Sequence, residues 1–259
     1  MCLLWLLSGG DLAAQVRLSN NPEETVYNLC QDFQALYTHI REQSISPDSA
    51  RTRFSAIMRA LRSRFPSVES LQSDSSVVNS DSLHKPVSPF VFPLRGHSAS
   101  SIGGSRGEGY RARGFDLFDF NVQGSHPAQD IFVRDRDQDS IEDRTGQPVD
   151  VLAMTSGLVI GIETAWLPGS EYRGGNWIWL YDPLQHGLFY YAHNNAVEVL
   201  PGQWVKAGQK IAEVGRTGYN AFKTRSPTHL HLMYLRILPN GLPEPRNTYD
   251  WLVVAQVMP

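Results

Sequence analysis

Apolar residues recur every three or four positions in two stretches near the start of the chain. The first stretch begins with Asn21 as an N-cap and Pro22 after it, and its apolar positions are Val26, Leu29, Cys30, Phe33, Leu36, Tyr37 and Ile40. The second begins at Ser46 and Pro47 and stops at Pro66, with apolar positions Ala50, Phe54, Ile57, Met58, Leu61 and Phe65. This period predicts two amphipathic helices. Their apolar stripes must pack together or against another part of the molecule.

The pattern changes from residue 89 onward to short apolar runs separated by Gly, Pro and Asn. Such runs are typical of β-strands joined by turns. We expect strands at residues 90–94, 115–122, 149–154, 157–164, 177–181, 187–192, 209–214 and 229–237. The predicted fold class is therefore mainly β, an antiparallel β-sheet or sandwich preceded by a small α-helical hairpin.

These changes of pattern divide the chain into four predicted parts. Residues 1–14 are a leader: an apolar start runs into Leu12-Ala13-Ala14-Gln15, which resembles a signal-peptide cleavage region. No Lys or Arg precedes the apolar run, which leaves a cytosolic protein with a frayed apolar start as the alternative to export. Residues 15–66 form the helical hairpin, and the Ser-rich residues 67–88, which lack a sustained period, form a linker. Residues 89–259 form the β-rich domain with a C-terminal tail.

Composition narrows the classes of protein that remain. Of the 259 residues, 41% are hydrophobic and 19% are charged, a globular balance with no run long enough to span a bilayer. The net charge of -3 provides no basic footprint for nucleic acid. Cys2 and Cys30 are the two cysteines, so neither a disulfide scaffold nor a cysteine-based metal site is available. A bound metal must therefore use nitrogen and oxygen donors.

Two histidines stand close together near the end of the chain, in Thr228-His229-Leu230-His231. The surrounding residues are apolar and predict a strand, so both imidazoles project from the same face. One site can therefore use both side chains. For this pair taken alone, a surface strand with two histidines by chance is the alternative.

A second polar segment, His126-Pro127-Ala128-Gln129-Asp130, lies about a hundred residues earlier. A straight strand would separate His126 from Asp130 by about 13 Å, so we expect the chain to turn between them. Gly124, Ser125 and Pro127 suit such a turn. Two histidines and one carboxylate are the donors of a catalytic zinc that keeps its fourth position open for water. A polar surface loop is the alternative for this segment alone.

His193 lies at the end of the predicted strand at residues 187–192 and shares a face with Tyr191. For this residue alone, a structural or surface histidine is the alternative. The other four histidines lie in no comparable setting; they are His39, His84, His97 and His186.

Taken in order, these segments resemble the LytM-like, lysostaphin-type zinc metallopeptidases that cut peptidoglycan peptides. The His-x-x-x-Asp motif of that family appears at residues 126–130, its Tyr-x-His at 191–193 and its His-x-His at 229–231. Residues 151–159 and 202–218 are similar to the turn-rich strand segments of the family. The resemblance covers about residues 90–238, and the three motifs stand in the family's order.

The resemblance implies roles for five residues. His126, Asp130 and His231 are the expected zinc ligands, and His193 and His229 are the expected catalytic side chains beside the water and the scissile carbonyl. One of them would accept the water's proton, and the other would hydrogen-bond the developing oxyanion. The His-Glu-x-x-His motif of other zinc proteases is absent from the sequence, so histidines must replace its carboxylate base.

The resemblance also implies a function. We expect a zinc endopeptidase of the bacterial cell envelope, periplasmic or secreted, that hydrolyses peptide bonds in peptidoglycan stems or cross-bridges. The alternative is a catalytically inactive LytM-like binding module that activates another cell-wall hydrolase. A further hypothesis is that the helical hairpin inhibits the site until it is removed, as propeptides do.

Residues 135–143 form a loop with alternating carboxylates, which resembles a calcium-binding loop. The loop departs from an EF-hand at the sixth and twelfth positions of that motif. Calcium is therefore a second and separate metal hypothesis. The alternative is a solvated acidic loop neutralised by Arg134, Arg136 and Arg144.

Overall fold

The computed structural model describes residues 22–65, 89–119 and 124–259. The helices are α1 (Pro22–Arg41), α2 (Pro47–Arg64), the short 3-10 helix η2 (Ala99–Ser101) and α4 (Tyr249–Val254). The strands are β1 (Ala128–Phe132), β2 (Asp150–Leu152), β3 (Gly157–Glu163), β4 (Asn176–Asp182), β5 (Gly187–Val197), β6 (Trp204–Val205), β7 (Lys210–Val214), β8 (His229–Ile237) and β9 (Pro243–Arg246). The expected leader, N-cap Asn21 and linker lie outside the described residues.

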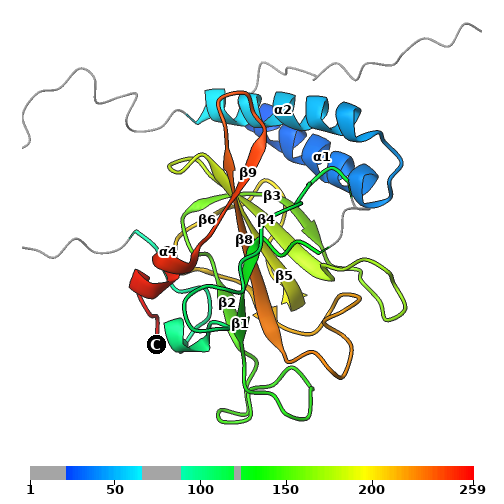
Figure 1. Ribbon diagram of the computed structural model, residues 1–259. Helices are drawn as coiled ribbons and strands as arrows, with labels where there is room; N and C mark the ends of the chain where they lie inside the picture. The colour runs from blue at the N-terminus through cyan, green and yellow to red at the C-terminus, as the bar shows by residue number, and fades with distance from the viewer. Residues whose placement is uncertain (1–21, 66–88, 120–123) are drawn as a thin grey trace, which may run out of the picture.

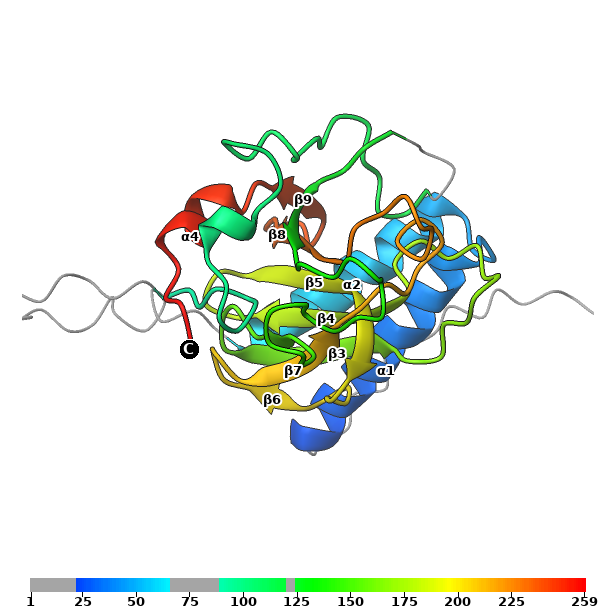
Figure 2. The ribbon, with the colours of Figure 1, turned by 90° about the horizontal axis from the view of Figure 1, so that it is seen from below.

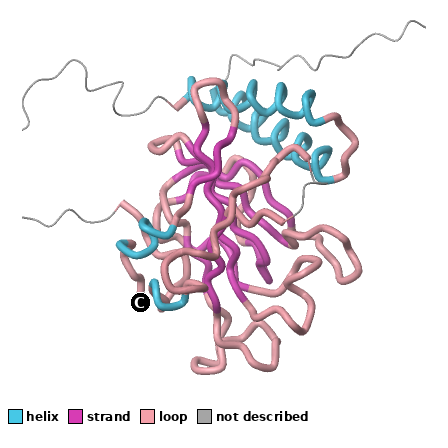
Figure 3. The backbone as a smooth tube through the Cα atoms, in the orientation of Figure 1, coloured by secondary structure: helices cyan, strands magenta, loops and turns pink. Residues whose placement is uncertain are grey.

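The nine strands of the described residues belong to one antiparallel sheet, which Figures 1 and 3 show with the two long helices across one end. The main path runs β1-β8-β5-β4-β3-β6. Away from this path, β2 pairs with β7, β7 pairs with β5, and β9 pairs with β8. The predicted fold class, a mainly antiparallel β structure with an N-terminal helical hairpin, is confirmed. No described helix has the length and apolar character that crossing a membrane requires.

Two of the predicted strands are wrong in the described residues. Residues 90–94 make only isolated bridges through Val91 and Leu94, because Pro93 interrupts the run and has no N–H for a ladder. In residues 115–119, the Asp116 carboxylate accepts a hydrogen bond from the Phe118 N–H at 2.9 Å and holds a turn instead. The remainder of that predicted strand, residues 120–122, lies outside the described residues.

Three observed strands and the helix α4 were not expected from the sequence. They are β1, β6, β9 and α4. β6 has two residues and β9 four, too few for an apolar period to show, and β1 carries Gln129 and Asp130 among its five residues. In β1 the polar residues interrupt the apolar alternation from which a strand is recognised.

Side chains of the central strands alternate between two hydrophobic cores, as the two-residue repeat of a strand requires. On β4, Trp177, Trp179 and Tyr181 enter one core, and Ile178 and Leu180 enter the other. The first core, here called the hairpin core, also contains the apolar stripes of α1 and α2. The second contains residues of β2, β7 and α4. The main sheet is therefore a middle layer, and the helices cover one of its faces (Figure 2).

Polar contacts fix α1 to the edge of the sheet in addition to the hairpin core. The Gln34 side-chain amide donates to the Ile162 carbonyl at 2.9 Å and accepts from the Ile162 N–H at 2.8 Å. Arg41, whose side chain is buried, forms an ion pair with the half-buried Glu163 at 3.0 Å. Because Gln34 pairs with β3 as a neighbouring strand would, the helix and the sheet hold one fixed arrangement.

Candidate metal centre and cleft

The three expected ligands meet where β1 pairs with β8. Asp130 and His231 are direct partners in the antiparallel ladder, and His126 lies just before β1. The Asp130 Oδ1 atom is 3.2 Å from His126 Nε2 and 3.0 Å from His231 Nδ1. One ligand atom from each residue lies within 4.8 Å of the other two. Residues a hundred positions apart in sequence therefore form one compact group of two nitrogen donors and one oxygen donor.

His126 reaches Asp130 because the chain between them is not a continuous strand. β1 begins only at Ala128, while His126 forms an isolated bridge with Arg111. The His126 Nδ1 atom lies 2.8 Å from the Gly109 carbonyl oxygen. A carbonyl only accepts hydrogen bonds, so Nδ1 carries the proton there and Nε2 faces Asp130.

The charge of this group depends on shared protons. Burial opposes ionisation of Asp130, but hydrogen bonds from His126 and His231 outweigh it and hold the pKa of that carboxyl far below its usual range. Burial also opposes protonation of His126, yet the hydrogen bond to Asp130 and its charge raise the pKa of the imidazole. The carboxylate is therefore ionised, which is the state in which it can bind a cation.

His193 enters the site through an irregular backbone. Its φ of 69° lies in the left-handed region, and β5 shifts register against β7 between Asn194 and Ala196. Such bulges re-aim side chains. The His193 Nδ1 atom lies 2.8 Å from the Thr217 carbonyl oxygen. The imidazole therefore turns Nε2 away from Thr217.

The expectation that His193 shares a face with Tyr191 is wrong. Tyr191 packs in the second core, and its hydroxyl accepts a hydrogen bond from the Met154 N–H at 2.9 Å. Strand alternation alone would direct both side chains the same way. The left-handed backbone at His193 breaks that alternation and brings its imidazole to the cleft.

His229 lies beside the three expected ligands. Its Nδ1 is 2.7 Å from the Pro227 carbonyl oxygen and its Nε2 is 3.7 Å from Asp130 Oδ1. The His193 and His229 ring centroids are 4.9 Å apart. Burial lowers the pKa of both imidazoles, that of His193 by more. Both histidines are thus held neutral, with Nδ1 protonated and Nε2 able to accept a proton.

The site histidines line a cavity of about 370 Å³. The four that border it are His126, His193, His229 and His231. Further lining residues come from the hairpin, through Tyr37, and from the loop at residues 115–119. This volume is at the lower end of the range of small-ligand pockets, about 300–1,000 Å³.

The acidic loop gathers a second group of carboxylates, Asp135, Asp137 and Asp143. Two of them already have partners: Asp135 accepts from the Thr228 hydroxyl at 2.6 Å, and Asp143 lies 3.6 Å from the Arg134 guanidinium. Asp137 and Asp143 are exposed, and exposed acidic groups commonly bind no ion. The calcium hypothesis gains no support, and the contacts are those of an acidic loop neutralised by arginines.

Sequence reasoning missed the backbone groups that orient the histidines. The carbonyls of Gly109, Thr217 and Pro227 each accept an imidazole proton, and a carbonyl leaves no signature in sequence. Gly218 is different, because a glycine is visible in the sequence and this one lies within residues 202–218. A Cβ at Gly218 would lie 2.9 Å from His193 Nδ1, so only glycine admits the imidazole there.

A family model matches part of the chain. Residues 140–241 match the model of peptidase family M23; this stretch begins after Asp130 and contains His193, His229 and His231. No curated protein matches the chain.

Solved structures provide three further similarities. A LytM protein from Ruminococcus gnavus is 23% identical with a TM-score of 0.44, over 65% of this chain and 62% of that chain. The catalytic domain of the antimicrobial peptidase lysostaphin from Staphylococcus simulans is 25% identical with a TM-score of 0.38, over 60% and 94%. A zinc-containing peptidase from Vibrio cholerae is 19% identical with a TM-score of 0.35, over 66% and 41%. The chain thus spans less than two thirds of the LytM protein.

The motif order seen in the sequence and the family match over the strands that carry His193, His229 and His231 point to the same relationship. Over residues 140–241, this chain is similar to peptidase family M23, and its motifs resemble those of the LytM-like peptidases.

Proposed function

We propose that the protein is a zinc metalloendopeptidase that hydrolyses peptide bonds in the stems or cross-bridges of bacterial peptidoglycan. The observation that carries this proposal is the group of His126, Asp130 and His231, whose ligand atoms lie within 4.8 Å of one another. Two imidazoles and one carboxylate are the donors of hydrolytic zinc sites with an open position.

The orientation of the two histidines fits the binding of a zinc ion. The atoms that would bind zinc, His126 Nε2 and His231 Nδ1, are the same atoms that face the Asp130 carboxylate. Zinc binding replaces protons on its ligands, and here it would replace the protons that the carboxylate now attracts. The Gly109 carbonyl would keep the His126 ring in place, as an outer hydrogen bond does for metal-binding histidines.

The chemistry divides between the metal and two histidines. Zinc, when bound, supplies Lewis acidity that activates water and polarises the peptide carbonyl. His193 and His229 hold Nε2 unprotonated, because each donates its Nδ1 proton to a backbone carbonyl. Either Nε2 can therefore take the proton of the attacking water, and the imidazolium that forms can donate to the developing oxyanion or to the departing amine.

The substrate and the location follow from the family and the motif resemblance. We propose peptidoglycan peptides as the substrate and a periplasmic or secreted location, with residues 1–14 as the leader that directs export. The division into hairpin, linker and β-rich domain is part of the same proposal. No observation favours an inactive module that activates another hydrolase, because the ligands and both accessory histidines are present and converge.

The test combines metal content with a digest. Purified protein is assayed for bound zinc and incubated with purified peptidoglycan, and released fragments are identified by mass spectrometry. We expect about one zinc per chain and new peptide fragments from the wild type. His126→Ala should lose both. His39→Ala, an exposed histidine on α1, is the matched control and should retain both.

Two results would contradict the proposal. One is wild-type protein that binds no zinc. The other is an identical fragment pattern from wild type and His126→Ala. If purified protein releases nothing but accelerates an added hydrolase equally well with His126→Ala, the inactive-module alternative replaces the enzyme.

A further inference from the structure

The helical hairpin and the metal centre lie on the same face of the sheet. On β8, His231 has the same two-residue phase as Met233 and Leu235, which belong to the hairpin core. On β1, Asp130 follows Ala128, another residue of that core, by two positions. The face on which a peptide would cross the ligands therefore continues directly under α1 and α2.

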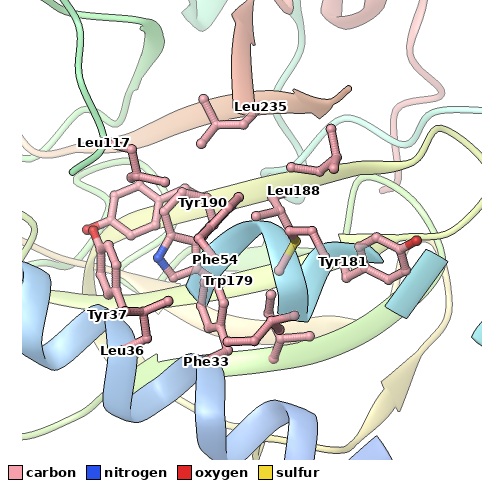
Figure 4. Close-up of a cluster of buried hydrophobic side chains, with 14 of the residues drawn as sticks. Phe33, Leu36, Tyr37, Phe54, Leu117, Trp179, Tyr181, Leu188, Tyr190 and Leu235 are labelled. Carbon is pink, nitrogen blue, oxygen red and sulfur yellow. The ribbon is translucent and has the colours of Figure 1, made fainter. Parts of the chain in front are cut away.

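The hairpin reaches the edge of the cleft through Tyr37. Tyr37 lines the same cavity as the four site histidines, and it hydrogen-bonds Tyr190 through its side chain. The Tyr190 ring centroid is 6.4 Å from that of His231. An extended peptide advances about 3.3 Å per residue, so Tyr190, which separates Tyr37 from His231, spans about two residues of a bound peptide. Figure 4 shows Tyr37 and Tyr190 in one cluster with Leu117.

The loop at residues 115–119 lines the same cavity, and α2 holds it in place. Arg51 on α2 pairs with Asp116, and Phe54 packs edge-on against Phe118 with ring centroids 5.3 Å apart. Phe115 is half-buried and borders the cavity. The hairpin therefore sets this side of the cleft both directly, through Tyr37, and through the loop that it anchors.

The hairpin lacks the properties of a removable inhibitor. Trp177, Trp179 and Tyr181 are at most 1% exposed beneath it, and removing the helices would uncover an aromatic surface unusual for a soluble protein. Within the described part of the hairpin, no residue joins the group of metal ligands, and Tyr37 alone borders the cavity. The helices close one end of the cleft and leave the ligands open.

We infer that the hairpin is a permanent end wall of the substrate cleft, so that the enzyme cuts peptides that end within a few residues of the scissile bond on the hairpin side. The inference rests on the proposed peptidase function and deepens it. An open groove would take the interior of a long cross-bridge, whereas this cleft selects a chain terminus on one side.

The experiment uses the full chain and three synthetic peptides. The first is the shortest peptide, identified from the peptidoglycan digest, that wild type still cuts. The other two carry three added glycines at the amino or the carboxyl end. We expect one extension to lower kcat/KM at least about tenfold and the other to change it less than about twofold, because only one end meets the wall.

Substitutions connect the length limit to the hairpin side. The measured quantity is the ratio of kcat/KM for the extended peptide to kcat/KM for the short peptide. Phe115→Ala should reverse at least about half of the decrease in the logarithm of this ratio that the wild type shows. Phe65→Ala makes the same chemical change at a half-buried position of the hairpin that contacts Trp204 and lies outside the cavity lining. It should leave the ratio unchanged.

Docking of the hairpin is checked in each variant through Cys30. This thiol is fully buried in α1 against the Val159 carbonyl, and burial raises its pKa to about 12. It should resist alkylation at pH 8 in every folded variant, with the Cys30 peptide read separately by mass spectrometry. A variant whose Cys30 reacts is replaced by Tyr37→Phe, which keeps the ring, removes the hydroxyl at the wall and should alter the same ratio.

The outcomes separate the two proposals. Equal rates for all three peptides overturn the end wall and leave the peptidase intact. A length limit with the same ratio in wild type, Phe115→Ala and Tyr37→Phe also overturns it. No cutting of any peptide or of peptidoglycan overturns the peptidase itself.

Discussion

His193 owes its place to backbone geometry more than to the residues beside it in sequence. Its left-handed φ, the bulge after it and the Thr217 carbonyl direct the ring to the cleft. A non-glycine residue in this region carries strain that the surrounding structure must hold. His126 and His229 depend on backbone carbonyls in the same way. At the residue scale, backbone carbonyls orient three of the four imidazoles of the site.

Gly218→Ala should therefore reduce catalysis without removing zinc. Gly218 has φ of 110°, and an added Cβ would lie 2.2 Å from the Arg173 carbonyl oxygen and 2.9 Å from His193 Nδ1. We expect kcat/KM to fall about 100-fold or more, within the range that a displaced acid–base group contributes. Zinc content should remain that of wild type, because His193 is not among the proposed ligands.

The control is Gly146→Ala, where φ is 63° and no atom lies within 4 Å of the added Cβ. This change imposes backbone strain at a distance from the cleft and should leave kcat/KM within about twofold. Equal losses in the two variants would show that strain, and not displacement of His193, explains the effect.

At the element scale, the hairpin and the sheet share one core. Phe33 on α1 stacks with Tyr37 and meets the edge of Trp179 on β4, at centroid distances of 6.1 Å in both cases. The helical periods were readable from the sequence, and both helices formed where they were predicted. Their partner was not readable, because an amphipathic stripe records that a face is buried and not what covers it.

Phe33→Ala should destabilise the whole β domain. Phe33 is 1% exposed, and truncating a buried phenylalanine costs about 3–5 kcal/mol. Because helix and sheet share the core, we expect one cooperative urea transition with a lower midpoint, followed by circular dichroism in the β region. Tyr27→Ala on the same helix, where the side chain is 53% exposed, should change stability by less than about 0.5 kcal/mol. An early, separate transition in Phe33→Ala would mean that the hairpin unfolds on its own.

At the scale of the whole molecule, the metal centre joins distant parts of the chain. Asp130 on β1 and His231 on β8 are adjacent only because those strands pair. The same two strands also contribute residues to the sheet face that the hairpin covers. Binding at this junction therefore acts on the stability of the entire sheet.

Added zinc should raise the melting temperature of metal-free protein. At a hundredfold excess over Kd, ligand binding stabilises the native state by about 2.7 kcal/mol, which is about 5–10 °C for a domain of this size. Differential scanning calorimetry with and without zinc measures the shift. His126→Ala should lose it, while Asp137→Ala in the acidic loop should keep it. A shift that survives in His126→Ala would place the zinc elsewhere.

The sequence by itself determined which side chains are available as metal ligands and where the two long helices form. The spacing of His126 and Asp130, the His-x-His of β8 and the helical period of residues 22–64 are local, and local spacing limits what a backbone can form. The order of the motifs also indicated the family that the chain resembles. Strand β1 stayed hidden because its polar residues, Gln129 and Asp130, break the apolar alternation from which strands are recognised.

Only the tertiary structure decided how these parts meet. The pairing of β1 with β8, the turn of His193 away from the side of Tyr191 and the position of Tyr37 at the end of the cleft join residues far apart in sequence. Such contacts depend on which faces pack together, and the energy of packing belongs to pairs of elements and not to either one alone.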